Sequence, residues 1–182
     1  RSAIENIRLV EDVIDFCSHL NLPGILIFLD FKKAFDNVNH DFLFQLLQRF
    51  QFKDSFIRWI KVLYNNASGK VINNGWVTKD FKIEQGVRQG CPLSALLFLL
   101  VADVMTRKIK QNANIKGITI HNSKEAKYEE NEIVISQLAD DTVVFVDSVK
   151  SGNTALEVIE QFGDFAGPSL NLSKTHAITT SL

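Results

Sequence analysis

The sequence predicts an α+β fold in which helices pack on one face of a largely antiparallel sheet. Residues 2–20 carry apolar side chains at the i, i+3, i+4 spacing of an amphipathic helix. Short apolar runs of β type lie at residues 25–29 and 133–146, and each contains or precedes acidic residues. The predicted order is α, β, α, α, β-hairpin, α, β-hairpin, α, β. Such a mixture favours a helix layer on a sheet over an all-helical or all-sheet domain.

The first half of the chain contains strong local signals. Pro23-Gly24 ends the first helix, and the next two helices each open on an Asp able to cap them, Asp41 and Asp54. Asn74-Gly75 is the strongest two-residue signal for a hairpin turn. The predicted segments are a helix over 2–20, a strand over 25–31, helices over 41–50 and 54–64, and a hairpin over 70–77.

The second half is predicted around one long helix that starts at Ser94. Its first half is apolar on nearly every side and should be buried, while Arg107, Lys108 and Lys110 near its end suit the helix dipole. Gly167-Pro168 breaks the last helix. The predicted segments are a loop over 86–92, a helix over 94–110, a strand over 117–121, a charged loop over 122–131, a hairpin over 133–146, a helix over 153–165 and a strand over 175–180.

Length and composition predict one folded domain. The chain has 182 residues, 46% of them hydrophobic and 14 of them Phe, which is enough for one core. Its longest apolar stretch, residues 95–102, is far shorter than the roughly 20 residues that cross a bilayer, so no membrane partner is expected. Because the chain starts at Arg1 without a Met or a secretory leader, we expect a fragment of a longer protein.

Cysteine usage and charge constrain the environment. Cys17 and Cys91 have no CxxC partner and fit reduced thiols of an intracellular protein, nuclear or cytoplasmic. The net charge of −1 gives no general basic excess, so any contact with nucleic acid must come from local patches or from other parts of a longer chain. Neither feature predicts an oligomeric state.

Acidic residues interrupt or end two buried strands. Asp140 and Asp141 sit side by side within the apolar run 133–146, and Asp30 ends the run 25–29. Adjacent carboxylates repel, and such placements usually persist because a cation binds there. Three carboxylates at strand ends would suit two divalent metals, an arrangement that catalyses nucleotidyl transfer. Ordinary turn-forming Asp residues remain the alternative interpretation.

Four short segments of the chain follow one another in a telling order. They are residues 28–36 (FLDFKKAFD), 86–94 (GVRQGCPLS), 138–141 (LADD) and 170–175 (LNLSKT). In this order they resemble motifs A, B, C and D of reverse transcriptases, particularly the LINE-type, non-LTR retrotransposon branch. The resemblance spans most of the chain. It implies the palm of a right-hand polymerase with part of the fingers, the thumb being absent from residues 1–182.

The resemblance also implies roles for individual residues. The catalytic residues would be Asp30, Asp140 and Asp141, and the metal ligands for two Mg²⁺, with Mn²⁺ as a substitute, would be Asp30, Phe31, Asp140 and Asp141. The substrate-binding residues would be Phe35 as a steric gate against the 2′-hydroxyl, Gln89 and Gly90 beside the nucleotide, and Lys174 at the departing pyrophosphate. Asp36 is expected to be a structural hydrogen-bonding residue. A core position for Phe35, an ordinary turn for Gly90 and a solvated Lys174 are the alternatives.

Two positions depart from the family pattern, since Leu138 replaces an aromatic residue and Ala95 replaces a common Pro. The implied function is RNA-directed DNA synthesis, with an RNA template, a DNA primer and dNTPs as partners. Two alternatives remain open. One is a domesticated or decayed copy that acts as a non-catalytic nucleic-acid-binding or assembly module, and the other is a splicing maturase.

Overall fold

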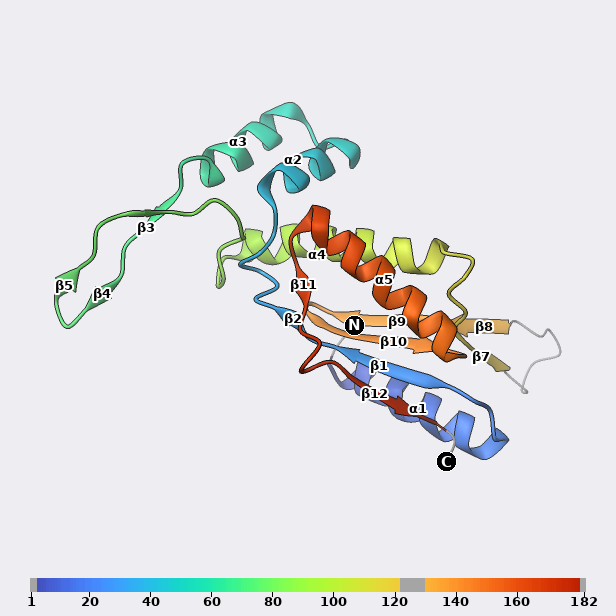
Figure 1. Ribbon diagram of the computed structural model, residues 1–182. Helices are drawn as coiled ribbons and strands as arrows, with labels where there is room; N and C mark the ends of the chain where they lie inside the picture. Colours follow the sequence, from blue (N-terminus) through green and yellow to red (C-terminus); the bar gives the residue numbers. More distant parts are fainter. Residues whose placement is uncertain (1–2, 122–129, 181–182) are drawn as a thin grey trace.

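The computed structural model describes residues 3–121 and 130–180. It confirms the α+β class (Figure 1). The predicted loop over 122–131 falls mostly outside the described residues, and its last two residues belong to a strand. The elements in chain order are α1 (Ala3–Leu20), β1 (Ile25–Leu29), β2 (Phe31–Lys32), α2 (His40–Arg49), α3 (Asp54–Tyr64), β3 (Ser68–Gly69), β4 (Ile72–Asn73), β5 (Trp76–Val77), β6 (Phe81–Lys82), α4 (Pro92–Gln111), β7 (Ile118–His121), β8 (Glu130–Ile133), β9 (Ile135–Leu138), β10 (Asp141–Val146), α5 (Val149–Ala166), β11 (Ser169–Leu170) and β12 (His176–Thr179).

A four-stranded antiparallel sheet forms the centre of the molecule, in the order β12-β1-β10-β9. β1 lies between two strands that come much later in the chain. Its register against β10 pairs Ile25 with Val146 and Leu29 with Thr142. The hairpin predicted within residues 133–146 is confirmed as β9 and β10.

Helices cover both faces of this sheet (Figure 1). Ile27 and Val144 belong to the main core, which includes residues of α2, α4 and α5. The alternate residues Leu26 and Phe145 point to the opposite face, where they pack with Val13 of α1. The expectation of helices on a single face is therefore incomplete, because the amphipathic stripe of α1 needs an apolar surface of its own and finds it on the second face.

The predicted caps of α2 and α3 differ from the structure, and so do the predicted starts of α4 and α5, since α5 begins at Val149 and not at residue 153. Asn39, and not Asp41, caps α2, since its side chain accepts a hydrogen bond from the N–H of Phe42 at 2.9 Å. Lys53 precedes α3 and makes no capping side-chain bond, so Asp54 lies within the first turn. α4 begins at Pro92, before the predicted Ser94, and proline at the first helical position is well tolerated.

The first half of α4 is less buried than its composition predicts. Leu97 and Phe98 are buried, but Leu96 and Leu99 on the other side of the helix are 62% and 58% exposed. Helix α4 packs against α2, α5 and β9, which leaves one side of its N-terminal half uncovered. The prediction of all-round burial is therefore wrong.

A two-stranded arm, residues 68–82, projects from the body between α3 and α4 (Figure 1). Its tip is the predicted hairpin, with Asn74 at φ +50° and Gly75 at φ +83°, and β4 pairs with β5 there. Nearer the body β3 pairs with β6, a pairing that the sequence did not predict. Within the described residues, no helix is long and apolar enough to cross a membrane.

Candidate active site

Two of the predicted catalytic carboxylates lie at the same end of neighbouring strands. Asp30 follows directly after Leu29, which pairs with Thr142, and Asp141 directly precedes Thr142 as the first residue of β10. Asp140 lies in the two-residue turn that joins β9 to β10 and is exposed. The register of the sheet thus brings Asp30 and Asp141 together at one end of the neighbouring strands β1 and β10, and Asp140 precedes Asp141 in the chain.

The donor set suits a hard divalent cation, although the side chains are not closed around one point. Among the described residues, none of the three carboxylates takes part in an ion pair. No group of three or more His, Cys, Asp or Glu side chains in that part of the chain is arranged to hold a metal ion. Phe31, the other predicted ligand, begins β2 next to Asp30 and pairs with Leu170. Three carboxylates with no competing cation nonetheless fit Mg²⁺ or Mn²⁺ chemically.

The turn that carries Asp140 has an unusual backbone. Ala139 adopts φ +55°, a left-handed conformation that an L-residue reaches at a cost of about 1–2 kcal/mol. The neighbouring residues Leu138 and Asp141 pair across the hairpin and fix the two ends of the turn. The sheet therefore imposes this conformation on Ala139, and backbone strain of this kind often occurs at functional sites.

The segment after α5 holds the backbone of Asp30. The N–H of Asn171 donates to the Asp30 carbonyl oxygen at 2.8 Å. The Thr175 hydroxyl accepts from the Asp30 N–H at 3.4 Å and donates to the Asn171 carbonyl oxygen at 3.1 Å. Lys174 lies in the same turn with an exposed side chain. Motif D is thus attached to motif A. Asn171 and Thr175 position the backbone of Asp30, a role that the motif resemblance did not predict.

The motif B loop is docked on the motif A loop through backbone hydrogen bonds. The N–H of Gly86 donates to Val38 O at 2.7 Å, and the N–H of Val87 donates to Phe35 O at 2.7 Å. Gly86 adopts φ +91°, and a Cβ there would overlap the carbonyl oxygen of Asp36. The close approach requires glycine at this position.

Side chains reinforce this docking and place two predicted substrate residues. The Gln89 side-chain amide donates to Asp36 Oδ1 at 3.1 Å, which agrees with the hydrogen-bonding role expected for Asp36. Gly90, the other predicted residue, has φ +79° and no atom within 4 Å of the position that a Cβ would occupy, so it faces open space. Gln89 and Gly90 are therefore exposed on a loop fixed to motif A.

Phe35 lies half-buried near the end of the motif A segment. Its ring stacks on Phe98 of α4, with ring centroids 4.3 Å apart and an interplanar angle of 18°. This contact holds the ring in place and leaves part of it exposed. A position partly in the core is compatible with the predicted gate and with the alternative core role.

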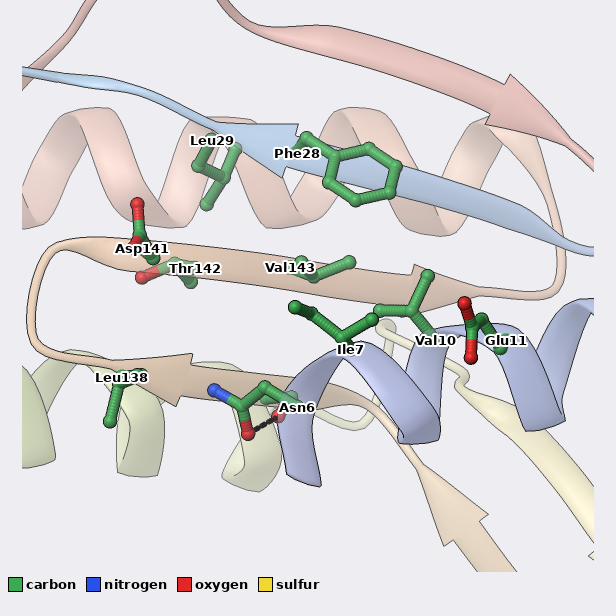
Figure 2. Close-up of a pocket in the computed structure, with 11 residues that line it drawn as sticks. Asn6, Ile7, Val10, Glu11, Phe28, Leu29, Leu138, Asp141, Thr142 and Val143 are labelled. Carbon is green, nitrogen blue, oxygen red and sulfur yellow. Dashed lines mark hydrogen bonds between the residues drawn. The ribbon is translucent and has the colours of Figure 1, made fainter. Parts of the chain in front are cut away.

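A pocket of about 510 Å³ opens beside Asp141, between the first turns of α1 and the sheet (Figure 2). Ile7 and Val10 of α1 point toward Val143, and Leu138 lies at the end next to Asp141. The buried Ser136 hydroxyl donates to Asn6 Oδ1 at 3.0 Å and connects α1 to β9. Sequence reasoning missed Asn6 and Ser136, because their contact joins residues that are 130 positions apart.

Cys91, in the motif B loop, is expected to react unusually fast with alkylating reagents. The backbone N–H groups of Ser94 and then Leu93, at the start of α4, lower the pKa of its thiol. Since the folded pKa is lowered, the thiolate should form at a lower pH than in a free cysteine, where the pKa is about 8.5. Iodoacetamide labelling followed by mass spectrometry over a pH series would measure this.

The internal control for this experiment is Cys17, which is fully buried and should label only after unfolding. A Cys91→Ser variant should lose the fast-labelling site. A labelling midpoint for Cys91 at or above that of a free cysteine would contradict the prediction.

Comparisons with known proteins fit this geometry. The family model for "Reverse transcriptase (RNA-dependent DNA polymerase)" matches residues 2–182. The chain is 28% identical over 178 residues to the "Transposon TX1 uncharacterized 149 kDa protein" of Xenopus laevis, covering 98% of this chain and 13% of that protein. It is 27% identical over 151 residues to the "Retrovirus-related Pol polyprotein from type-2 retrotransposable element R2DM" of Drosophila melanogaster, covering 82% of this chain and 13% of that protein.

Solved structures share the fold at low sequence identity. The apo telomerase of Candida tropicalis, truncated from its C-terminal domain, superposes with a TM-score of 0.69 at 17% identity, over 98% of this chain and 35% of that one. The telomerase of Candida albicans in complex with a fragment of telomeric RNA gives 0.69 at 14% identity, over 98% and 30%. The similarity supports a shared palm architecture.

Proposed function

The chain belongs to the reverse transcriptase (RNA-dependent DNA polymerase) family, in the branch of the LINE-type, non-LTR retrotransposons, and on this premise we propose that residues 1–182 form the palm and adjoining fingers of an enzyme that copies RNA into DNA. The reaction transfers a dNMP from a dNTP to a primer 3′-hydroxyl. The primer oxygen forms a bond to the α-phosphorus, the bond to the pyrophosphate breaks, and the hydroxyl proton is released.

One observation carries the proposal: the sheet register places Asp30 and Asp141 at the same end of adjacent strands, with Asp140 in the adjoining turn. In this proposal Asp30, Asp140, Asp141 and Phe31 would hold two divalent ions. When bound, Mg²⁺ or Mn²⁺ would lower the pKa of the primer hydroxyl and stabilise the negative charge on the leaving pyrophosphate.

The other residues would bind and orient the substrates. Gln89 and Gly90 would contact the incoming nucleotide from the loop that is docked on motif A. Lys174 would place its positively charged ammonium group near the departing pyrophosphate, where it could also donate a proton. The turn that contains Lys174 is attached to Asp30 by the hydrogen bonds of Asn171 and Thr175. Metal binding by Asp30 and pyrophosphate binding by Lys174 would therefore be positioned together.

Primer extension on an RNA template with Mg²⁺ or Mn²⁺ tests this function, comparing the chain with its Asp140→Ala variant. Extension by the original chain that the variant loses is the expected result. Retention of full extension by Asp140→Ala would refute the site. If neither extends the primer, Mn²⁺ binding decides, because an intact site should bind Mn²⁺ and lose it on Asp140→Asn.

A second candidate is a non-catalytic nucleic-acid-binding or assembly module. It is favoured by the absence, within the described residues, of a side-chain group already arranged to hold a metal. This candidate predicts RNA binding without Mn²⁺ binding, so the same two measurements separate it from the enzyme.

Phe35→Ala is expected to weaken the discrimination between dNTPs and NTPs. The ring, fixed by its stack on Phe98, would overlap a 2′-hydroxyl, and overpacking of that kind costs about 1–3 kcal/mol. Loss of that clash corresponds to a roughly 5- to 150-fold gain in relative NTP incorporation. Single-nucleotide extension with each substrate would measure the ratio of kcat/KM values.

Phe98→Leu is the control for this prediction, because it removes the stacking partner and keeps the Phe35 ring itself. It should destabilise the protein with a smaller effect on sugar selection. Equal discrimination by Phe35→Ala and the original chain would assign Phe35 to the core alone.

A further inference from the structure

The arm, residues 68–82, exposes several large apolar side chains that pack in neither core of the protein. Ile72 is 72% exposed, Trp76 83% and Val77 57%, and each of its strands has only two residues. Neither hydrophobic core cluster includes a residue of the arm. Ile72 and Val77 lie opposite each other across the hairpin, and exposed apolar surface of this kind often marks an interaction site.

The arm is nevertheless ordered by its own hydrogen bonds. Val71 and Thr78 are linked twice, through Thr78 N–H to Val71 O and Val71 N–H to Thr78 Oγ1, both at 3.0 Å. At its base the N–H of Ile83 donates to Ala67 O at 2.8 Å. Val87, which follows the arm in the same connection, donates to the Phe35 carbonyl oxygen of motif A, so the base of the arm is attached to the candidate active site.

The two aromatic rings of the arm have different environments. Phe81 lies directly over Gly69 on the paired strand, with a ring carbon 2.8 Å from where a Cβ would be, so this ring packs within the arm. Trp76 lies next to the tip, opposite Asn73, and makes no aromatic or cation–π contact among the described residues. Its face is therefore free to receive another planar group.

The charge of the arm favours an anionic partner. It contains Lys70, Lys79 and Lys82 against Asp80, a net charge of +2 in a chain whose net charge is −1. Asp80 is paired with Lys70 at 3.2 Å, which leaves Lys79 and Lys82 without an ion pair in the described part of the chain. Unpaired cations on the same arm as an exposed aromatic ring suit the phosphates and bases of a nucleic acid better than an apolar protein surface.

We propose that the arm binds single-stranded nucleic acid, with an unpaired base stacked on Trp76 and phosphates held by Lys79 and Lys82. A base in a duplex is already stacked on its neighbours, so the free indole selects unpaired strands. This inference deepens the proposed function, because it assigns a second contact for the template strand away from the catalytic carboxylates. Binding at the arm requires no metal ion.

The test is binding of a short fluorescent single-stranded RNA to the whole chain, measured by anisotropy in EDTA. Trp76→Ala should weaken binding by about 5- to 150-fold, the loss of one stacked base. Trp59→Ala is the matched control, since Trp59 is also exposed, at 69%, but lies on α3, and this variant should bind normally. Lys79→Ala with Lys82→Ala should reduce the salt slope by about 1.4, the release of two counterions.

Tryptophan fluorescence gives a direct readout of stacking. The chain has two tryptophans, so Trp59→Phe leaves Trp76 as the single reporter. Its emission should be quenched by single-stranded RNA and much less by a blunt duplex. Unchanged affinity of Trp76→Ala, absence of quenching, or an emission change that depends on protein concentration without RNA would each overturn the proposal.

The outcome is separable from that of the catalytic proposal. Asp140→Ala should bind the single-stranded RNA in EDTA as the original chain does, whether or not primer extension occurs. A chain that extends primers but binds RNA equally well with Trp76→Ala would refute the arm and keep the enzyme. RNA binding that depends on Trp76, in a chain that neither extends primers nor binds Mn²⁺, would keep the arm and refute the enzyme.

Discussion

Replacing Asp30 with Ala is expected to abolish DNA synthesis and to leave the fold intact. The fold should survive because the hydrogen bonds to Asn171 and Thr175 use the backbone of Asp30, which Ala retains. Catalysis should not, because a metal ligand at the end of β1 is lost. A loss of about 4 kcal/mol in transition-state stabilisation corresponds to a roughly thousandfold slower reaction. Primer extension by this chain, or by a longer protein that contains it, is the measurement.

Asp103→Ala is the matched control for this prediction. Asp103 is also a carboxylate, but it lies on α4 and is paired with the exposed Arg107 at 2.7 Å. Its replacement should leave extension unchanged, since a surface pair of this kind contributes about 0–1 kcal/mol. The prediction would be contradicted if Asp30→Ala extended primers at the rate of the original chain. It would also be contradicted if the circular dichroism spectrum of this variant were that of an unfolded chain.

Gly86→Ala is expected to cause the largest loss of stability among single methyl additions at the site. A left-handed φ costs an L-residue about 1–2 kcal/mol. The new Cβ would also meet the backbone of Asp36, and overpacking adds about 1–3 kcal/mol. A total of about 3 kcal/mol would lower Tm by roughly 6–12 °C in a domain of this size. Thermal unfolding measured by circular dichroism would test this.

Gly90→Ala separates the two contributions, because Gly90 has a similar φ of +79° but open space around its Cβ position. It should show the conformational cost alone and lose no more than about half as much stability. Equal destabilisation of the two variants would mean that the contact between Gly86 and Asp36 does not limit the loop.

Local signals predicted much of the fold. The turn at Asn74-Gly75 and the end of α5 at Gly167, with φ +101°, depend on residues within a few positions and were predictable. The exposure of Leu96 was not, because the pattern of α4 shows that a side chain is apolar and does not show which neighbour covers it. Pairing of two-residue strands such as β2 and β11 carries too little pattern to detect.

The candidate site divides in the same way. The sequence predicted the residue types, since acidic residues at the ends of apolar strands are visible in one dimension. It did not predict that the register sets Asp30 beside Asp141. It also could not identify the bonds of Asn171 and Gly86, because these run through backbone groups that every residue has.

The central place of β1 has a consequence for synthesis on the ribosome. This strand is made early, but its partners β10 and β12 lie more than 100 residues later in the chain. During translation, the backbone N–H and C=O groups of residues 25–29 therefore stay unpaired at first. Their pairing requires the closure of a long loop, which costs conformational entropy. The nascent chain cannot bring Asp30 beside Asp141 until residues near 146 have emerged. A product truncated before β12 would still lack the second partner of β1 and would expose an aggregation-prone strand edge.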